Sequence, residues 1–329
     1  MKVGITYDLR QDYLDQGYKP EETAEFDKIE TIDNIDNALK NLGFETERIG
    51  NIKSLVKKLA EGQRWDIVFN IAEGMYGLAR ESQIPALLDA YKIPYTFSDS
   101  FMLGICLHKG ITKTLVRNLG LSTPDYYIVK TEKDIDNINL PFPLFAKPAA
   151  EGTGKGINAA SRINTKEELQ KVCINLLEQF KQPVLVETYL TGREFTVGIV
   201  GSEENSKVIG VMEINLNEKA EKHAYSYNNK ENYEELVSYE IIKGEIANKC
   251  AELALKAWKG LHLRDAGRLD IMLDGKGIPN FLEVNPLAGL NPITSDLPMM
   301  CGKLGITFQE LIDMIMKSAL RRINLIESK

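Results

Sequence analysis

The most constraining feature of this sequence is a strand–turn–strand pattern near its C-terminal end. The turn residues "GKG" separate "RLDIMLD" from "IPNFLEVN", which is the spacing of a β-hairpin. If the turn centres between its last two residues, Asp270 pairs with Glu283 and Arg268 pairs with Asn285. Side chains alternate along a strand, so these four share one face of the hairpin. The opposite face is then apolar and consists of Leu269, Ile271, Leu282 and Val284.

The polar face of this hairpin has two interpretations. Two carboxylates and an amide oxygen on rigid strands suit Mg²⁺, which is usually held by one or two carboxylates together with substrate phosphates. The adjacent arginine suits a phosphate or a developing oxyanion. An exposed sheet face crossed by ion pairs explains the same spacing. The hairpin alone leaves both interpretations open.

Composition narrows the class of protein. The chain has 329 residues, of which 43% are hydrophobic and 26% charged, as in a globular protein of two or three domains. A net charge of −7 argues against a general nucleic-acid or acidic-membrane surface. No apolar segment has the length of a membrane span, and the N-terminus lacks a signal-peptide pattern. Four widely spaced cysteines indicate free buried thiols in a reducing cytoplasm.

The order of predicted elements suggests three units. Residues 1–98 alternate strand and helix patterns, which predicts an α/β domain with a parallel sheet. In such a domain ligands bind at the carboxyl ends of the strands, so the loops "DLRQDY" and "NIAEGMYG" are candidate site loops. Residues 99–186 and 187–329 mix strands and helices and form the second and third units.

Two further stretches carry site candidates. In "LFAKPAAEGTGKGI" a strand delivers Lys147 to a loop with three glycines, whose backbone N–H groups suit phosphate oxygens. A plain hairpin explains this loop equally well. In "VLVETYLTGREFTV" Glu187 ends one strand and Glu194 opens the next. These acids suit an adenine edge and ribose hydroxyls, or they flank an ordinary hinge.

Taken in order, these motifs resemble the ATP-grasp superfamily and, within it, the D-alanine–D-alanine ligase family. The resemblance extends over "KPAAEGTGKGI", "VLVETYLTGREFTVGIVG", "GRLDIMLD", "FLEVNPLAGLNP" and "GITFQELI". It implies an ATP-grasp fold, with an N-terminal parallel-sheet domain and two α+β subdomains that clasp ATP. It also implies a cytoplasmic ATP-dependent ligase of peptidoglycan biosynthesis that acts on small amino acids, and a homodimer formed through the first unit.

The resemblance assigns a nucleotide site. Lys109 and Lys147 match the lysines that hold ATP phosphates, and Glu194 matches the ribose ligand. Glu187 and the backbone through Leu190 match the adenine hinge. The implied nucleotide-binding residues are Lys109, Lys147, Thr153, Gly154, Glu187, Leu190 and Glu194.

The resemblance also assigns the reaction centre. Asp270, Glu283 and Asn285 match the ligands of Mg²⁺, for which Mn²⁺ is a substitute. Arg268 matches the arginine that stabilises the oxyanion, and Lys230 matches a lid lysine over the γ-phosphate. A substrate carboxylate would attack that phosphate to give an acylphosphate, which the second substrate's amine would attack in turn. A nucleotide-binding regulatory protein without ligase activity is the alternative.

The chain departs from the family pattern around its substrates. Thr153 replaces the first of two serines in the glycine loop and keeps a hydroxyl for the first substrate's amine, and an extra Lys155 follows. Glu231 stands where an aromatic follows the lid lysine. Gly289 is retained, and Ser295 falls near the pocket for the second substrate's carboxylate.

The acid for the first substrate's amine is either Glu25 or Glu30, and we assign Glu30. Asp27 and Glu30 also have the spacing of a helix capping box, which makes a structural role for Glu30 the alternative. Glu231 and Lys155 either face the substrate, which would then be more polar than D-alanine, or point to solvent.

Overall fold

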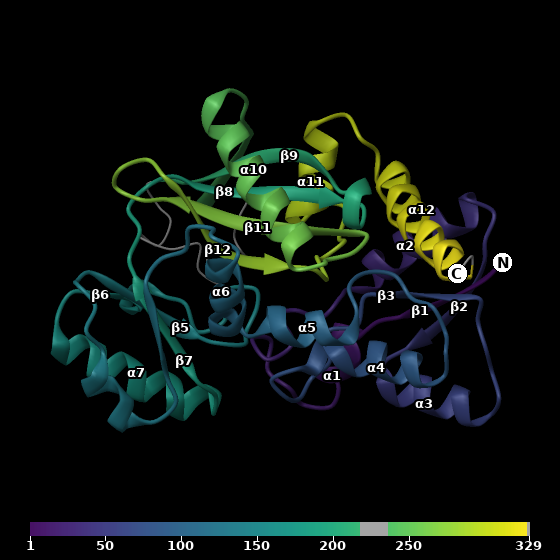
Figure 1. The fold of residues 1–329 in the computed structure, drawn as a ribbon. Coiled ribbons are helices and arrows are strands. Elements are labelled where there is room, and N and C mark those ends of the chain that lie inside the picture. The colour runs from purple at the N-terminus through teal and green to yellow at the C-terminus, as the bar shows by residue number, and fades with distance from the viewer. Residues whose placement is uncertain (218–235, 328–329) are drawn as a thin grey trace.

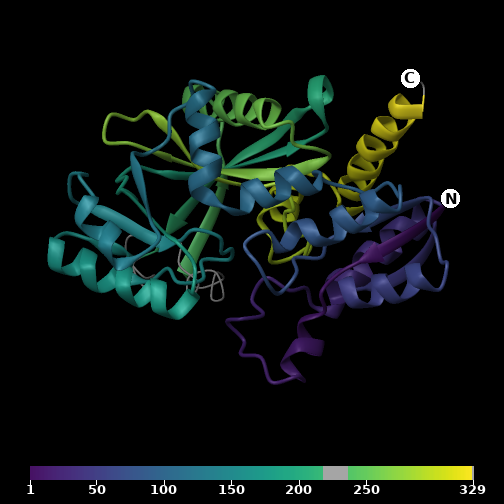
Figure 2. The ribbon, with the colours of Figure 1, turned by 60° about the horizontal axis from the view of Figure 1, so that its bottom comes forward.

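We describe a computed structural model that covers residues 1–217 and 236–327. Within these residues the strands form three sheets, arranged in two lobes with the third sheet above the others (Figures 1 and 2). The ATP-grasp expectation of one parallel sheet and two mixed layers is confirmed. No helix in the described part of the chain is long and apolar enough to cross a bilayer.

The first sheet has the order β2-β1-β3 and is parallel throughout, as predicted. Its helix α2 buries Ile32, Ile35 and Leu39, which recur at helical spacing. Beside this sheet, Val68 of β3 also forms a single isolated parallel bridge with Tyr95. The elements here are β1 (Lys2–Thr6), α1 (Arg10–Leu14), α2 (Ile29–Asn41), β2 (Glu45–Gly50), α3 (Ile52–Ala60), β3 (Ile67–Asn70), η1 (Arg80–Ser82), α4 (Gln83–Ala90) and α5 (Ser100–Leu107).

The second sheet has the order β4-β7-β5-β6, with antiparallel neighbours. Helix α7 covers it, and Thr165 caps this helix by accepting the Glu168 N–H. The elements here are α6 (Lys109–Asn118), β4 (Tyr126–Val129), η2 (Glu132–Asn137), β5 (Leu144–Pro148), η3 (Ala159–Ser161), β6 (Arg162–Ile163), α7 (Lys166–Phe180) and β7 (Val184–Thr188).

The third sheet has the order β10-β9-β8-β11-β12 and is antiparallel. Helix α10 packs on it through the fully buried Trp258. The elements here are β8 (Glu194–Val200), η4 (Glu203–Asn205), β9 (Lys207–Leu216), β10 (Val237–Ile241), α10 (Glu245–Gly260), β11 (Ala266–Leu273), β12 (Pro279–Asn285), α11 (Asp296–Lys303) and α12 (Phe308–Glu327).

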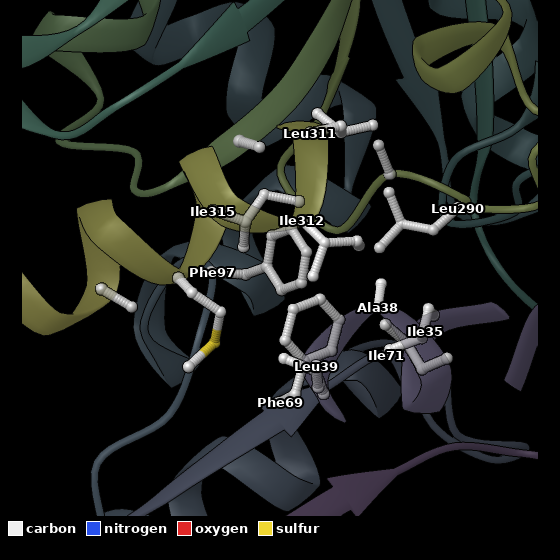
Figure 3. Packing of buried hydrophobic residues seen from close by; sticks show 14 of the residues in the cluster. Ile35, Ala38, Leu39, Phe69, Ile71, Phe97, Leu290, Leu311, Ile312 and Ile315 are labelled. Atoms are coloured by element: carbon white, nitrogen blue, oxygen red, sulfur yellow. The ribbon is translucent and has the colours of Figure 1, made fainter. Parts of the chain in front are cut away.

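The C-terminal helix α12 packs against the first sheet and its helix α2, and not only against the third sheet. Leu311, Ile312 and Ile315 lie against Leu39 of α2 and Phe97 in one buried cluster (Figure 3). A division into residues 1–98, 99–186 and 187–329 stays a prediction, and α12 packs across it. This contact ties the third unit firmly to the first. All four cysteines are free and buried, as predicted.

Candidate active site

The hairpin of β11 and β12 has the predicted pairing where its polar residues lie. Arg268 pairs with Asn285, and Asp270 pairs with Glu283. Leu269 and Val284 lie on the other face and are buried in the core, also as predicted. The four polar side chains therefore share the face that looks toward the second sheet.

The prediction for Leu282 was wrong. The Asp274 carboxylate accepts the N–H groups of Lys276 and Ile278, and the pairs Ile271–Phe281 and Met272–Asn280 centre the turn on Lys276, half a residue earlier than expected. A register shift between Asp270 and Ile271 absorbs the difference. Such a bulge leaves one extra residue on β12. Phe281 consequently takes the core position, and Leu282 lines a cavity beside Glu283.

Arg268 is held between two carboxylates. Its Nη1 donates to the Asp270 Oδ2, and its Nε lies 3.4 Å from the Asp296 Oδ2. Burial would lower the pKa of Arg268, but the charges of Asp270 and Asp296 outweigh it and raise that pKa. The guanidinium is therefore a fixed, permanent charge at the base of the hairpin.

The hairpin residues fit a divalent cation chemically. Asp270, Glu283 and Asn285 supply two carboxylates and an amide oxygen, which are hard donors. The Asp270 Oδ1 is buried and accepts no hydrogen bond from the described residues. A buried oxygen without a donor needs another positive partner. No cluster of three or more His, Cys, Asp or Glu ligands occurs in the described part of the chain, so a cation here would depend on the amide and on phosphate oxygens.

Two lysines approach the hairpin from the second sheet and from α6. The Lys147 Nζ lies 3.0 Å from the Glu283 Oε2 and 3.7 Å from the Glu187 Oε1. The Lys109 Nζ lies 3.8 Å from the Glu283 Oε2 and donates to the Glu151 carbonyl. Burial lowers the pKa of Lys109, whereas Glu283 and Glu187 outweigh burial at Lys147 and raise its pKa. Both lysines thus place their side-chain nitrogens beside the Glu283 carboxylate.

The smaller of two adjoining cavities lies between the second and third sheets and has a volume of about 90 Å³. Phe145 and Tyr189 form one apolar wall, with ring centroids 6.2 Å apart and an interplanar angle of 26°. Apolar walls with a few charged groups suit a flat heterocycle. The predicted residues that line this cavity are Lys109, Lys147, Gly154, Glu187, Leu190, Glu194, Asp270 and Glu283.

Sequence reasoning missed Lys113. It is fully buried on α6, and its Nζ lies 2.8 Å from the Glu187 Oε2, 3.1 Å from the Thr123 Oγ1 and 3.3 Å from the Phe281 carbonyl. Its spacing of four residues from Lys109 was the available signal, because i and i+4 share a helix face. The Glu187 carboxylate thus pairs with both Lys113 and Lys147 and links α6 to two strands of the second sheet.

The larger cavity has a volume of about 260 Å³ and continues from the smaller one. It lies between the hairpin end, the glycine loop and the loops of the first sheet. The predicted residues that line it are Lys109, Thr153, Arg268, Glu283, Asn285, Gly289 and Ser295. Lys109, Glu151 and Glu283 line both cavities and therefore mark the point where they join.

Glu25, not Glu30, lines the larger cavity. Glu30 is exposed in the first turn of α2, outside the cavity lining. The capping box expected from Asp27 does not form, because the helix begins one residue later with Lys28 as N-cap and no side-chain cap. Burial would raise the pKa of Glu25, but Arg80 and Lys155 outweigh it and lower the pKa to about 2.

The glycine loop is shaped around Glu25. A Cβ atom on Gly152 would lie 2.2 Å from the Glu25 Oε1, so only glycine permits this approach. Lys155 does not point to solvent. Its Nζ lies 2.6 Å from the Glu25 Oε2 and 2.6 Å from the Glu151 Oε2. The lysine that breaks the family pattern therefore neutralises acids of the cavity wall.

Arg80 is a second buried cation that sequence reasoning missed. It lies just beyond the candidate loop "NIAEGMYG", on η1, and is 5% exposed. Its Nη2 donates to both Glu25 oxygens, at 2.9 and 2.8 Å, and its Nη1 donates to the Ala150 carbonyl at 2.8 Å. Lys230 and Glu231 lie outside the described residues.

Comparisons with known proteins identify the family of this chain. The family described as "D-ala D-ala ligase C-terminus" matches residues 115–317. The D-alanine–D-alanine ligase of Aquifex aeolicus is 34% identical over 284 residues, which cover 85% of this chain and 91% of that protein. The D-alanine–D-alanine ligase of Thermotoga maritima is 30% identical and covers 87% of this chain and 90% of its own length.

Solved structures agree on the fold. The D-alanine–D-alanine ligase of Bacillus anthracis complexed with ATP has a TM-score of 0.74 at 23% identity, over 98% of this chain and 97% of that one. The VanG D-Ala:D-Ser ligase of Enterococcus faecalis has a TM-score of 0.74 at 20% identity, over 97% and 99%. The chain therefore belongs to the D-alanine–D-alanine ligase family and is an ATP-dependent, ADP-forming ligase with an ATP-grasp fold.

Proposed function

We propose that this enzyme joins D-alanine to itself, or two other small amino acids to each other, through an acylphosphate. The observation that carries the proposal is the junction of the two cavities. Lys109 and Glu283 line both, and Arg268 lines the larger one beside them. A ligase of this type must bring a phosphate from one site to a carboxylate in the other, so its charged groups belong at such a junction.

In the proposed reaction the adenine ring occupies the smaller cavity between Phe145 and Leu190. Lys109 and Lys147 bind the phosphates and neutralise charge as a substrate carboxylate attacks the γ-phosphate, the bond to the β–γ bridging oxygen breaks, and ADP leaves. Asp270, Glu283 and Asn285 would hold Mg²⁺, or Mn²⁺ in its place. The cation, when bound, would polarise phosphate oxygens and orient them for in-line transfer.

The second step requires an oxyanion site and the exclusion of water. The amine of the second amino acid attacks the acylphosphate carbonyl, Arg268 stabilises the oxyanion of the tetrahedral intermediate, and the C–O bond then breaks to release inorganic phosphate as the amide forms. Thr153 orients the first amino acid, and Gly289 with Ser295 receives the carboxylate of the second. Lys230 is proposed to close over the γ-phosphate, which would keep water from the acylphosphate.

The deciding experiment measures phosphate release from ATP with D- and L-amino acids supplied singly and in pairs, with the dipeptide identified by mass spectrometry. We expect release that depends on an amino acid and a product of matching mass. Arg268→Met should lose this turnover and keep its nucleotide affinity. A regulatory nucleotide-binding protein would bind ATP with no amino-acid-dependent release, and that outcome would reject the proposal.

We also propose that the enzyme works in the cytoplasm as a homodimer formed through the first unit. The absence of a membrane-spanning helix in the described residues is compatible with this setting. Sedimentation of the full chain tests the dimer, because a single species at the monomer mass of 37.0 kDa would reject it.

A further inference from the structure

The wall of the larger cavity opposite the hairpin carries a carboxylate that the proposed reaction does not use. Glu81 on η1 lines this cavity and is only 8% exposed. Across residues 1–217 and 236–327, no hydrogen bond or ion pair reaches its carboxylate. Glu73, from the loop after β3, lines the same wall. A buried carboxylate without a partner is costly, so its position beside a substrate cavity points to a ligand cation.

The cations near Glu81 are committed to other acids. Arg80 directs one nitrogen to both oxygens of Glu25 and another to a carbonyl. Lys155 bridges Glu25 and Glu151 at 2.6 Å each. Arg80, Lys155 and Lys109, whose charge also acts on Glu81, are paired with Glu25, Glu151 and Glu283, so Glu81 and Glu73 have no ion pair among the residues that the structure describes.

The pKa values of the two carboxylates in this wall are consistent with their lack of a cation partner. Burial raises the pKa of Glu81 to about 7, although the charge of Arg80 lowers it. Burial and the charge of Glu81 raise the pKa of Glu73 well above its ordinary value. Charged or titratable groups that act on Glu81 or feel its charge are Glu25, Glu73, Arg80, Cys106 and Lys109.

Glu25 is not free to bind an ammonium group of the substrate. Both of its oxygens accept from Arg80, and Lys155 lies against one of them. The protein's own cations therefore occupy the acid nearest the glycine loop. Thr153 is proposed to meet the α-ammonium of the first amino acid, so a second ammonium on its side chain would meet Glu81 and Glu73, whose carboxylates have no hydrogen bond or ion pair within the described residues.

We propose that Glu81, supported by Glu73, is a specificity determinant that selects a first amino acid with a second, side-chain ammonium group. The substrate class is a short diamino acid, in place of an amino acid with an apolar side chain. This inference rests on the proposed function, since it names the substrate of the same site. An ammonium–carboxylate hydrogen bond in a buried setting is strong enough to discriminate against an isosteric methyl group.

The test is a competition between D-2,4-diaminobutyrate and D-norvaline, which differ only by an ammonium in place of a terminal methyl. Full-length enzyme receives ATP, Mg²⁺ and both amino acids at equal concentration, and mass spectrometry identifies the N-terminal residue of the dipeptide. The ratio of the two dipeptide products equals the ratio of the kcat/KM values of the two amino acids at the first site. We expect diaminobutyrate to lead by about tenfold or more, and Glu81→Gln to reduce the ratio by about tenfold.

Glu132→Gln, an exposed carboxylate on η2, is the matched control and should keep the wild-type ratio. Thermal melting establishes that Glu81→Gln is folded. A wild-type enzyme that uses norvaline or D-alanine as well as diaminobutyrate would overturn the inference and leave the ligase assignment intact. An unchanged ratio in Glu81→Gln would also overturn it.

Calorimetry separates this inference from the proposed function. Diaminobutyrate and norvaline are titrated into enzyme with a non-hydrolysable ATP analogue, at pH 7 in buffers of different ionisation enthalpy. The ammonium should lower the raised pKa of Glu81, so wild-type enzyme should release protons and Glu81→Gln should release fewer. If no dipeptide forms in any assay, the proposed function fails, and this binding preference alone decides the inference. Equal binding without proton release would reject it.

Discussion

Lys113 on α6 and Glu187 at the end of β7 form an ion pair of 2.8 Å in which the side chains are 0% and 4% exposed. The pair joins the helix that carries Lys109 to the strand that leads into the hinge. Glu187 also lies 3.7 Å from Lys147. This contact therefore couples the stability of the second sheet to the position of Lys147, the lysine that we propose binds phosphate.

We predict that Lys113→Met destabilises the protein by about 3–5 kcal/mol, because the buried Glu187 carboxylate loses the closest cation that neutralises it. Urea unfolding followed by circular dichroism measures this change. Lys171→Met, at an exposed position on α7, is the control and should change stability by less than about 0.5 kcal/mol. The double variant Lys113→Met with Glu187→Gln should recover part of the loss. A single variant as stable as the control would refute the role of the pair.

Glu283→Gln combined with Asn285→Ala should abolish turnover and leave the fold intact. Both side chains lie on the cavity face of β12, whereas Val284 between them packs in the core. Phosphate release measures turnover, and circular dichroism measures the fold. Val284→Ala is the reciprocal control, since it should lose stability more than chemistry. Near-full activity in the double variant would mean that the assignment of the metal site is wrong.

Lys147→Ala should weaken nucleotide binding by about 1.5–3 kcal/mol, the value of one charged hydrogen bond. Titration calorimetry with a non-hydrolysable ATP analogue measures the affinity. Lys166→Ala changes an exposed lysine at the start of α7 and should bind like the wild type. If Lys147→Ala binds equally well, the glycine loop and its strand are an ordinary hairpin.

The pH dependence of stability should report Glu25. Its pKa falls from an ordinary 4.5 to about 2 in the folded protein, because Arg80 and Lys155 favour the charged form. A depressed carboxyl pKa stabilises the fold above the unfolded value and loses this contribution as the pH falls toward the folded value. Wild-type stability should therefore drop between pH 4.5 and about pH 2. Glu25→Gln should show a smaller drop in urea melts over that range, and an identical drop would contradict the assignment.

The chain's local patterns determined much of the architecture. Alternating strand and helix periods predicted the parallel first sheet, and side-chain alternation predicted that Arg268, Asp270, Glu283 and Asn285 share one face. These are properties of neighbouring residues, because the period of a strand or helix fixes which side chains point the same way. The position of Leu282 was the exception, since one residue of turn geometry moves a side chain to the other face.

Only the tertiary structure decided which buried charges meet. Arg80 reaches Glu25 across 55 residues, Lys113 reaches the Phe281 carbonyl across 168, and Lys147 reaches Glu283 across 136. Sequence alone left Glu25 and Glu30 as alternatives, and packing of the first-sheet loops put Glu25 in the cavity. The physical reason is that ion pairing in a buried site depends on distance and desolvation, which arise only when separate elements pack together.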